Sequence, residues 1–185
     1  VANLETVDKG KKILAGNSRV LSARLSDAKF FLENDLSVIR SFGLSPFVEK
    51  LSRITFHNKI GNQLERVRSI KKLSGYLASR LKANVEDCEL AAHYCKADLP
   101  SEVVREFPAL QGKMGHYYAI ENGNSKDVAV ACAEHYLPLG PSDPVPQNLI
   151  ATVVALADKI HTLTSFWSIN EKPTGSKDPY ALRRM

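Results

Sequence analysis

The first quarter of the chain has the apolar spacing of an amphipathic helix. After Ser18, a residue type that caps helices, apolar side chains recur every three or four positions, at Val20, Leu21, Leu25, Ala28, Phe31 and Leu32. This period of about 3.6 residues predicts a helix over residues 18–36. Gly43 then breaks the pattern, and Ser45 followed by Pro46 is typical of the start of a second helix.

The apolar stripe of this second helix has no clear stop. Its first positions are Phe47, Leu51, Ile54 and Ile60. The pattern therefore places His57 on a helix. Beyond Gly61 the helical spacing continues at Leu64, Val67, Ile70, Leu73, Leu77 and Leu81. We expect a helix that continues through Gly61, or bends there, and ends near Lys82.

Caps and helix breakers divide the middle of the chain. Asn84, with Asp87 three residues later, resembles a capping box and predicts a helix that reaches about Asp98. Pro100 closes that helix. Pro108 predicts the first turn of the next one.

The last third of the chain begins with a turn signal. The cluster of residues 122–124, Asn-Gly-Asn, ends one helix and caps another that reaches about Tyr136. Four prolines within residues 137–147 predict an irregular loop. The apolar run from Leu149 to Phe166 predicts a buried helix, and Asp178 with Pro179 is typical of a further helix start. Because no segment sustains a period of two, the pattern favours an all-α orthogonal helical bundle.

Composition narrows the class of protein. With 185 residues and 44% hydrophobic content, one domain with a sizeable core is the default. We find no apolar run approaching the roughly 20 residues of a membrane span, so a soluble, cytoplasmic protein is expected. The cysteines Cys88, Cys95 and Cys132 fit neither a zinc knuckle nor a disulfide framework and are expected to be buried thiols. The net charge of +5 weakly favours a polyanionic partner.

A metal site is one candidate for chemistry. Histidine and aspartate residues lie among apolar neighbours on predicted helices, and imidazole and carboxylate groups can hold a metal that activates water. The pattern resembles the HD phosphohydrolase superfamily, in which His57, Asp98 and Asp158 match the first histidine, the aspartate of the His-Asp pair and the final aspartate. Ala97 stands where the histidine of the pair is expected, so the metal motif is degenerate.

With one ligand missing, structural roles are favoured. We expect Asp98 to cap the segment after Leu99, His57 to be hydrogen-bonded in the core, and Asp158 to pair with a cation or a backbone amide. His135 is also expected to be structural.

Two groups of basic residues are candidates for binding RNA. One helix carries Arg66, Arg68, Lys71, Lys72, Arg80 and Lys82. Several cations directed at phosphates would give a strongly salt-dependent contact, although the same spacing also describes a solvated helix face. The second group flanks the loop of residues 173–178 and consists of Lys172, Lys177, Arg183 and Arg184. Loop amides and cations together could hold a phosphate, and packing between domains is an equal explanation.

Long segments of the chain resemble one known family. They are residues 96–99, KADL, 106–119, EFPALQGKMGHYYA, 157–159, ADK, and 173–184, PTGSKDPYALRR. Together with residues 16–21 and 24–31, they resemble the β subunit of glycyl-tRNA synthetase in the same order. Nearly the whole chain therefore resembles one internal stretch of that subunit.

The resemblance implies a part of a bacterial-type heterotetrameric glycine–tRNA ligase, which uses ATP and Mg²⁺ to charge tRNA(Gly). In that family the α subunit holds the adenylate-forming site and the β subunit mainly recognises tRNA. The implied domains are an extension over 1–17, an HD-like helical domain over 18–177 and, over 178–185, the start of a helix leading into an anticodon-binding domain.

This chain would then be a non-catalytic module, with no cofactor of its own, that helps to bind and orient tRNA for the α subunit. A metal-dependent nucleotide phosphohydrolase and a structural spacer without RNA contact are the alternatives.

Overall fold

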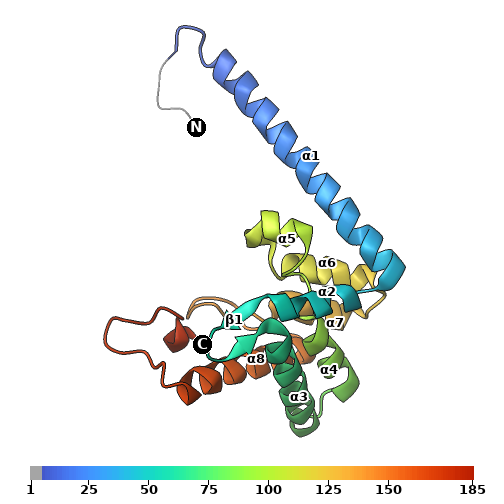
Figure 1. Ribbon diagram of the computed structural model, residues 1–185, viewed down its shortest axis with the longest axis vertical. Helices are drawn as coiled ribbons and strands as arrows, with labels where there is room; N and C mark the ends of the chain where they lie inside the picture. The colour runs from blue at the N-terminus through green and yellow to red at the C-terminus, as the bar shows by residue number, and fades with distance from the viewer. Residues whose placement is uncertain (1–5) are drawn as a thin grey trace.

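The computed structural model describes residues 6–185, and the regular secondary structure of this part is almost all helical (Figure 1). Its α-helices are α1 (Lys11–Phe42), α2 (Ser45–Lys50), α3 (Gln63–Leu81), α4 (Val85–Tyr94), α5 (Glu102–Glu106), α6 (Lys113–Glu121), α7 (Lys126–Glu134) and α8 (Leu149–Ser168). Short 3₁₀ turns are η1 (Leu51–Arg53), η2 (Pro108–Leu110) and η3 (Leu182–Arg184). The all-α prediction is confirmed, and residues 137–147 form the expected irregular loop.

The main core lies between α3, α4, α7 and α8. Its centre combines fully buried branched residues, among them Ile70, Val128 and Val153, with alanines and cysteines. The small side chains allow the helix backbones to approach one another closely. Cys88, Cys95 and Cys132 are all buried and unpaired, as the sequence predicted.

Helix α8 is the most apolar element of this core. Taken alone, its 20 residues with a hydropathy of 1.3 are long and apolar enough to cross a membrane, so the expectation that no such run exists was wrong. Half of this window is buried inside the protein, where α8 packs on α3, α4 and α7. A buried core helix passes the same test, so this helix alone is weak evidence for a membrane span.

Helix α1 is longer than predicted, and only its second half belongs to the bundle. Its C-terminal half packs on α5 and α6, while its N-terminal half projects away from the other helices (Figure 1). Leu14, Val20, Leu21 and Leu25 are 60–66% exposed there. The backbone is continuous from Lys11, so no break marks the expected boundary at residue 17, and residues 1–5 of the expected extension lie outside the described part.

A buried carboxylate joins α1 to its neighbours. Asp35 accepts hydrogen bonds from the backbone N–H groups of Glu102 (3.0 Å) and Val103 (3.1 Å) in the first turn of α5. It also accepts one from the hydroxyl of Tyr118 on α6, at 2.7 Å. Asp35 therefore satisfies orphan N–H groups at the start of α5 and orients three helices with one side chain.

The expected helix around His57 is wrong. Strand β1 (Thr55–His57) pairs antiparallel with β2 (Gly61–Asn62), and only then does α3 begin. Gly61 has φ +123°, a conformation that interrupts a right-handed helix. Asn62 and Glu65 form a complete capping box that starts α3 at Gln63. Because three or four apolar residues fit either period, the short strand was read as a helix.

Helix α6 also starts later than predicted. Pro108 opens the 3₁₀ turn η2, and α6 begins after Gly112. A Cβ on Gly112 would lie 3.1 Å from the carbonyl oxygen of Ala133, and one on Gly115 would lie 3.4 Å from that of Cys132. The two glycines therefore let α6 pack closely against α7.

The end of the chain folds back on the bundle instead of starting a helix at Pro179. Asp178 does act as a cap, because its carboxylate accepts from the backbone N–H groups of Leu182 (2.8 Å) and Arg183 (3.0 Å). The only helical turn that follows is η3. Leu182 is buried, and the ring of Tyr180 lies 4.4 Å from that of Phe166 on α8.

Candidate functional site

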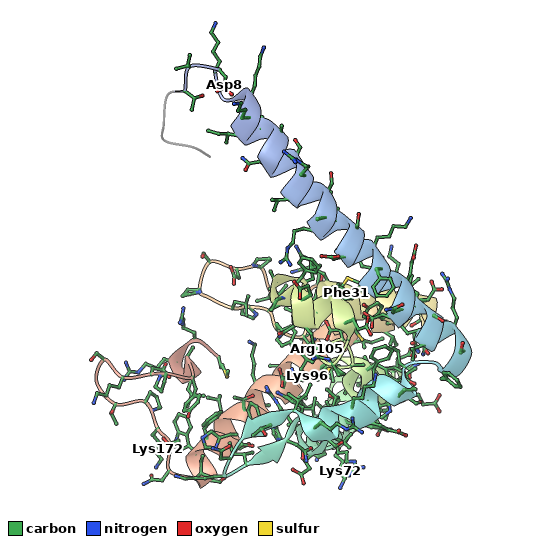
Figure 2. All side chains as sticks on the ribbon, turned by 45° about the horizontal axis from the view of Figure 1, so that its top comes forward. Asp8, Phe31, Lys72, Lys96, Arg105 and Lys172 are labelled. Carbon is green, nitrogen blue, oxygen red and sulfur yellow. The ribbon has the colours of Figure 1, made fainter. Side chains whose placement is uncertain are left out.

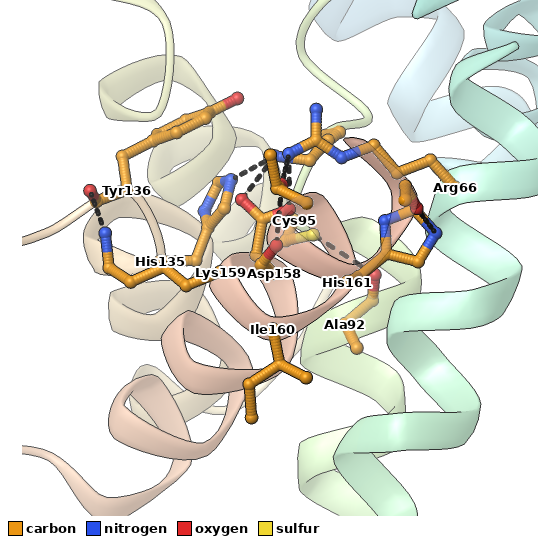
Figure 3. Close-up of polar contacts among 12 residues, drawn as sticks. Arg66, Ala92, Cys95, His135, Tyr136, Asp158, Lys159, Ile160 and His161 are labelled. Carbon is orange, nitrogen blue, oxygen red and sulfur yellow. Dashed lines mark hydrogen bonds and ion pairs between the residues drawn. The ribbon is translucent and has the colours of Figure 1, made fainter. Parts of the chain in front are cut away.

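Asp158 on α8 is the centre of a buried network of charged groups (Figure 3). Its Oδ1 accepts a hydrogen bond from Nη2 of Arg66 on α3, at 2.7 Å. Its Oδ2 accepts one from Nζ of Lys96, at 3.1 Å. The same Arg66 nitrogen donates to Oγ1 of Thr162 at 2.9 Å. We call Arg66, Lys96, Asp158 and His135 the buried charge network.

The fourth member, His135, is a neutral partner of Lys96. Its Nδ1 donates to the carbonyl oxygen of Cys132 at 2.9 Å, so its Nε2 accepts from Lys96 at 3.1 Å. Burial, followed by the nearby charge of Lys96, holds the pKa of His135 well below its usual range. The ring of Tyr136 lies 4.3 Å from the Lys96 ammonium and adds a cation–π contact.

Asp158 stays ionised in this network. Burial alone would raise the pKa of its carboxyl group, but the charges of Lys96 and Arg66 outweigh burial and hold the pKa well below its usual range. Asp158 pairs with two cations, Arg66 and Lys96, which confirms the expectation that it pairs with a cation. Two protein cations neutralise this carboxylate in the way that a metal ion would.

The structure does not bring His57, Asp98 and Asp158 together as a ligand set. His57 lies in β1, where its ring meets those of Phe166 (5.4 Å) and Tyr180 (5.7 Å). Asp98 is bound to backbone N–H groups of another segment. Within residues 6–185 no group of three or more His, Cys, Asp or Glu side chains could hold a metal. The residues present do not fit the metal centre of the HD superfamily.

Asp98 caps a helix other than the one expected. Its Oδ2 accepts from the backbone N–H groups of Gly112 (2.6 Å) and Gly115 (3.2 Å), so it caps α6. Ser101 caps α5, the segment after Leu99. Asp98 is fully buried, and burial raises its pKa to about 6 despite the two N–H donors.

The raised pKa of Asp98 predicts a pH dependence of stability. The folded state holds the Asp98 proton up to about pH 6, whereas the unfolded state loses it near pH 3.8. Folded protein thus binds more protons between these values, and stability falls as pH rises through this window. Relative to Asp98→Asn, the wild type should lose about 2 kcal/mol between pH 4.5 and 7.

Urea unfolding of both proteins at several pH values measures this difference. The comparison cancels the contributions of histidines such as His135, whose lowered pKa has the opposite effect on stability. A difference that stays constant across the pH range would contradict a raised pKa at Asp98.

The predicted basic face on α3 divides into buried and exposed parts. Arg66 belongs to the buried charge network, with its side chain only 11% exposed and its guanidinium 4.0 Å from the ring of Phe56. It is therefore not part of an exposed basic face. Lys71 is half-buried and lies 4.0 Å from Glu89 of α4.

The remaining four cations are exposed, and we call them the basic stripe: Arg68, Lys72 and Arg80 on α3, and Lys82, the C-cap residue that follows its last turn. Arg68, Lys72, Tyr76 and Arg80 follow one another at intervals of four residues, which places them on successive turns of the same face. The guanidinium of Arg80 lies 5.4 Å from the ring centre of Tyr76. Within residues 6–185 none of the four cations forms an ion pair. Lys72 lies at the outer edge of the molecule (Figure 2).

The second basic group lies on the folded-back C-terminal segment. Lys177 pairs through its backbone with Thr174, and Arg183 donates to the carbonyl oxygen of Gly175. Arg184 lines a pocket of about 230 Å³ together with Arg66. Two of the loop amides, those of Thr174 and Lys177, are therefore engaged with each other's carbonyl groups, while the side chains of Lys177, Arg183 and Arg184 are exposed.

The sequence reasoning missed the most unusual member of the network. Lys96 is 1% exposed and buried between helices, whereas the sequence indicates it only as part of a family motif. A signal was present, because Lys96 directly follows the buried Cys95 and precedes the buried Ala97. A lysine in the middle of a buried run is rare unless it is paired.

Comparisons with known proteins agree on one family. The family profile described as "Glycyl-tRNA synthetase beta subunit" matches residues 1–185. Among curated proteins, a glycine–tRNA ligase beta subunit from Ruegeria sp. (strain TM1040) is 57% identical over 185 residues, which is all of this chain and 27% of that protein. The corresponding subunit of Dinoroseobacter shibae is 55% identical and that of Ralstonia nicotianae 48% identical; each match covers this whole chain.

The chain thus spans about a quarter of the length of these relatives. Since the profile and the relatives match the chain from end to end, the chain belongs to the glycyl-tRNA synthetase beta subunit family.

Proposed function

We propose that the chain is a tRNA-binding module of a glycine–tRNA ligase β subunit and that the basic stripe contacts the RNA backbone. The observation that carries this proposal is that Arg68, Lys72 and Arg80 on α3 and Lys82 at its C-cap are exposed, and that none of them forms an ion pair within residues 6–185. Unpaired cations in a row match the regular charges of an RNA backbone. Tyr76, which is 57% exposed in the same row, offers a ring for an unpaired base.

Within the whole cytoplasmic enzyme, this module would help to hold tRNA(Gly) while the α subunit of a heterotetramer carries out aminoacylation with ATP and Mg²⁺. We assign no catalytic residue to the chain. Of the residues that could have held a metal, Asp158 pairs with two cations, Asp98 caps α6 and His57 packs against aromatic rings. This arrangement gives no support to a metal-dependent phosphohydrolase.

In this proposal, residues 18–177 form the HD-like body and residues 178–185 lead toward an anticodon-binding domain. Lys177, Arg183 and Arg184 would add a second contact with RNA at that end. Two observations support this contact. The three side chains are exposed, and their segment is held in place by the packing of Tyr180 on Phe166 of α8 and by the buried Leu182. Residues 1–17 would precede the body, continuous with α1.

A titration of fluorescently labelled tRNA with the chain over a series of salt concentrations tests the proposal. We expect binding that weakens steeply with salt, because four or more phosphates exchange counterions for protein cations. Comparison of tRNA(Gly) with another tRNA separates backbone contact from sequence recognition. Absence of binding at about 50 mM salt would contradict the proposal and favour a spacer that does not touch RNA.

A further inference from the structure

Helix α1 carries one apolar seam that the bundle covers only at its C-terminal end. The positions of this seam are separated by four or seven residues, so they lie along one side of the helix: Leu14, Leu21, Leu25, Leu32 and Ile39. Ile39 is 3% exposed, and Leu32 packs against the core cluster that contains it. The other three leucines are 60–64% exposed, and we call Leu14, Leu21 and Leu25 the bare seam.

The part of α1 that carries the bare seam has little contact with the other helices. Arg24 forms an ion pair with Glu106 of α5, and no side chain of α1 before Arg24 bonds to another helix within residues 6–185. Figure 2 shows α1 running from Phe31, beside the bundle, out to the turn that contains Asp8. The bare seam therefore lies along a projecting arm.

The local sequence does not by itself favour a helix in this arm. Gly16, Asn17 and Ser18 are three consecutive residues of low helix propensity inside α1. Isolated helices of about 15 residues are marginal in water, and most helical stability in proteins comes from packing of an apolar face. A stable helix over residues 11–25 therefore requires a partner on its apolar side.

The charges beside the bare seam indicate the chemistry of that partner. Between residues 11 and 25 the helix carries the cations Lys11, Lys12, Arg19 and Arg24 and no acidic residue. Leucines flanked by cations match an apolar protein surface that is edged by carboxylates. RNA is a poorer match, because phosphates contact the cations whereas leucine side chains require apolar surface.

A second copy of α1 offers too little surface to be this partner. Fully burying a leucine or valine side chain removes roughly 60–120 Å² of apolar surface from water. Two copies that face one another through the bare seam and the neighbouring Val20 would therefore bury roughly 300–600 Å² of apolar surface. A stable interface of about 1,200 Å² contains about 700 Å² of apolar surface. The cations of the two copies would also repel one another.

We propose that the bare seam is the docking surface for another part of the same β subunit. Because 185 residues are 27% of the Ruegeria subunit, roughly 500 residues of that protein lie outside the match. The bare seam continues the face through which α1 already packs on α5 and α6, so the partner extends that layer along the arm. A partner in the same polypeptide binds at a high effective concentration, which allows a small contact area.

Hydrogen–deuterium exchange of the full-length β subunit that carries this sequence tests whether the bare seam is covered. In the Leu21→Glu variant, amides of residues 14–25 should exchange at least about tenfold faster than in the wild type, because a glutamate there disrupts an apolar contact. Leucine and glutamate have similar helix propensity, so the helix itself is not weakened. If the exchange rates are unchanged, the seam lies in solvent and the proposal is overturned.

Ser26→Glu is the matched control for this variant. It places the same charge at an exposed position of α1 that points away from the side of Leu21. Exchange of residues 14–25 should then equal that of the wild type. If Ser26→Glu accelerates exchange as much as Leu21→Glu does, the effect comes from charge rather than from a covered seam, and the proposal is overturned.

Photocrosslinking identifies the partner. A benzophenone amino acid replaces Leu25 in the full-length β subunit, which is irradiated together with the α subunit and tRNA(Gly). We expect a crosslink inside one β polypeptide, with the mass of a single chain on a denaturing gel, to a peptide outside the stretch of these 185 residues. A crosslink to a second β subunit, to the α subunit or to tRNA overturns the proposal, as does the absence of any crosslink. Neither experiment measures tRNA affinity, so its outcome is independent of the basic stripe.

Discussion

Replacing Asp158 by alanine is expected to lower the free energy of unfolding by roughly 3–5 kcal/mol. The substitution leaves the cations of Arg66 and Lys96 facing one another in a buried site from which their shared carboxylate has been removed. Lys96 is almost completely buried and can reach water only if the helices move. An uncompensated buried charge costs far more than the pair contributes in its intact form.

Urea unfolding followed by circular dichroism measures this loss. The matched control is Asp27→Ala, which removes an exposed aspartate from α1 and should change stability by less than about 0.5 kcal/mol. Adding Lys96→Met to Asp158→Ala removes one of the two stranded cations and should recover part of the stability. A loss below about 1 kcal/mol for Asp158→Ala alone would mean that the cations have another anion or reach solvent.

Changing the basic stripe to alanine at all four positions is expected to reduce tRNA affinity by roughly 30-fold or more at low salt. This figure follows from four exposed charge contacts at roughly 0.5–1 kcal/mol each. The slope of log affinity against log salt should fall by roughly 3, because each lost phosphate contact removes about 0.7–0.9. Since the four side chains are exposed and have no ion-pair partner within residues 6–185, the fold should be unaffected.

A control variant with the same net charge shows whether the loss of tRNA affinity comes from the basic stripe or from the lower net charge of the protein. Alanine at Lys12, Arg19, Lys113 and Lys126 also removes four exposed cations, but from other faces of the molecule. Fluorescence titrations of both variants with the same labelled tRNA give the comparison. If the control loses as much affinity as the stripe variant, general charge rather than the basic stripe holds the RNA.

The first prediction depends on Arg66 and the second on Arg68, and these two cations of α3 have opposite surroundings. Arg66 and Arg68 are two positions apart on α3, yet the first is paired in the core and the second is free at the surface. Because each residue turns the helix by about 100°, their side chains point in nearly opposite directions. Treating the basic residues of α3 as one surface therefore merged a buried, paired arginine with exposed cations.

The sequence alone determined the features that depend on neighbours along the chain. Asn84 caps α4 and Asn148 caps α8 through their own side chains, and four prolines exclude a regular element from residues 137–147. The apolar period of α8 predicted a buried helix at nearly its observed bounds. The resemblance to one family was also readable, because long motifs occur in a fixed order.

Local signals were also present where the sequence reasoning failed. The capping box of Asn62 and Glu65 marks the true start of α3, and Gly61 marks the turn before it. The apolar spacing nevertheless fits a helix across both signals, so it predicts the wrong element here. A short hairpin is only marginally stable by itself, and here it is held by packing of Phe56 on Phe166 of α8.

Only the tertiary structure decided which charged residues are buried and with whom they pair. Arg66 and Asp158 are 92 residues apart, and Lys96 and Asp158 are 62 apart, so no local pattern links them. Asp98 caps α6 because the fold places its carboxylate beside Gly112 and Gly115. The spacing of apolar residues along the chain indicates which face of a helix is apolar. The partner of a buried charge depends instead on which helices pack against one another in the fold.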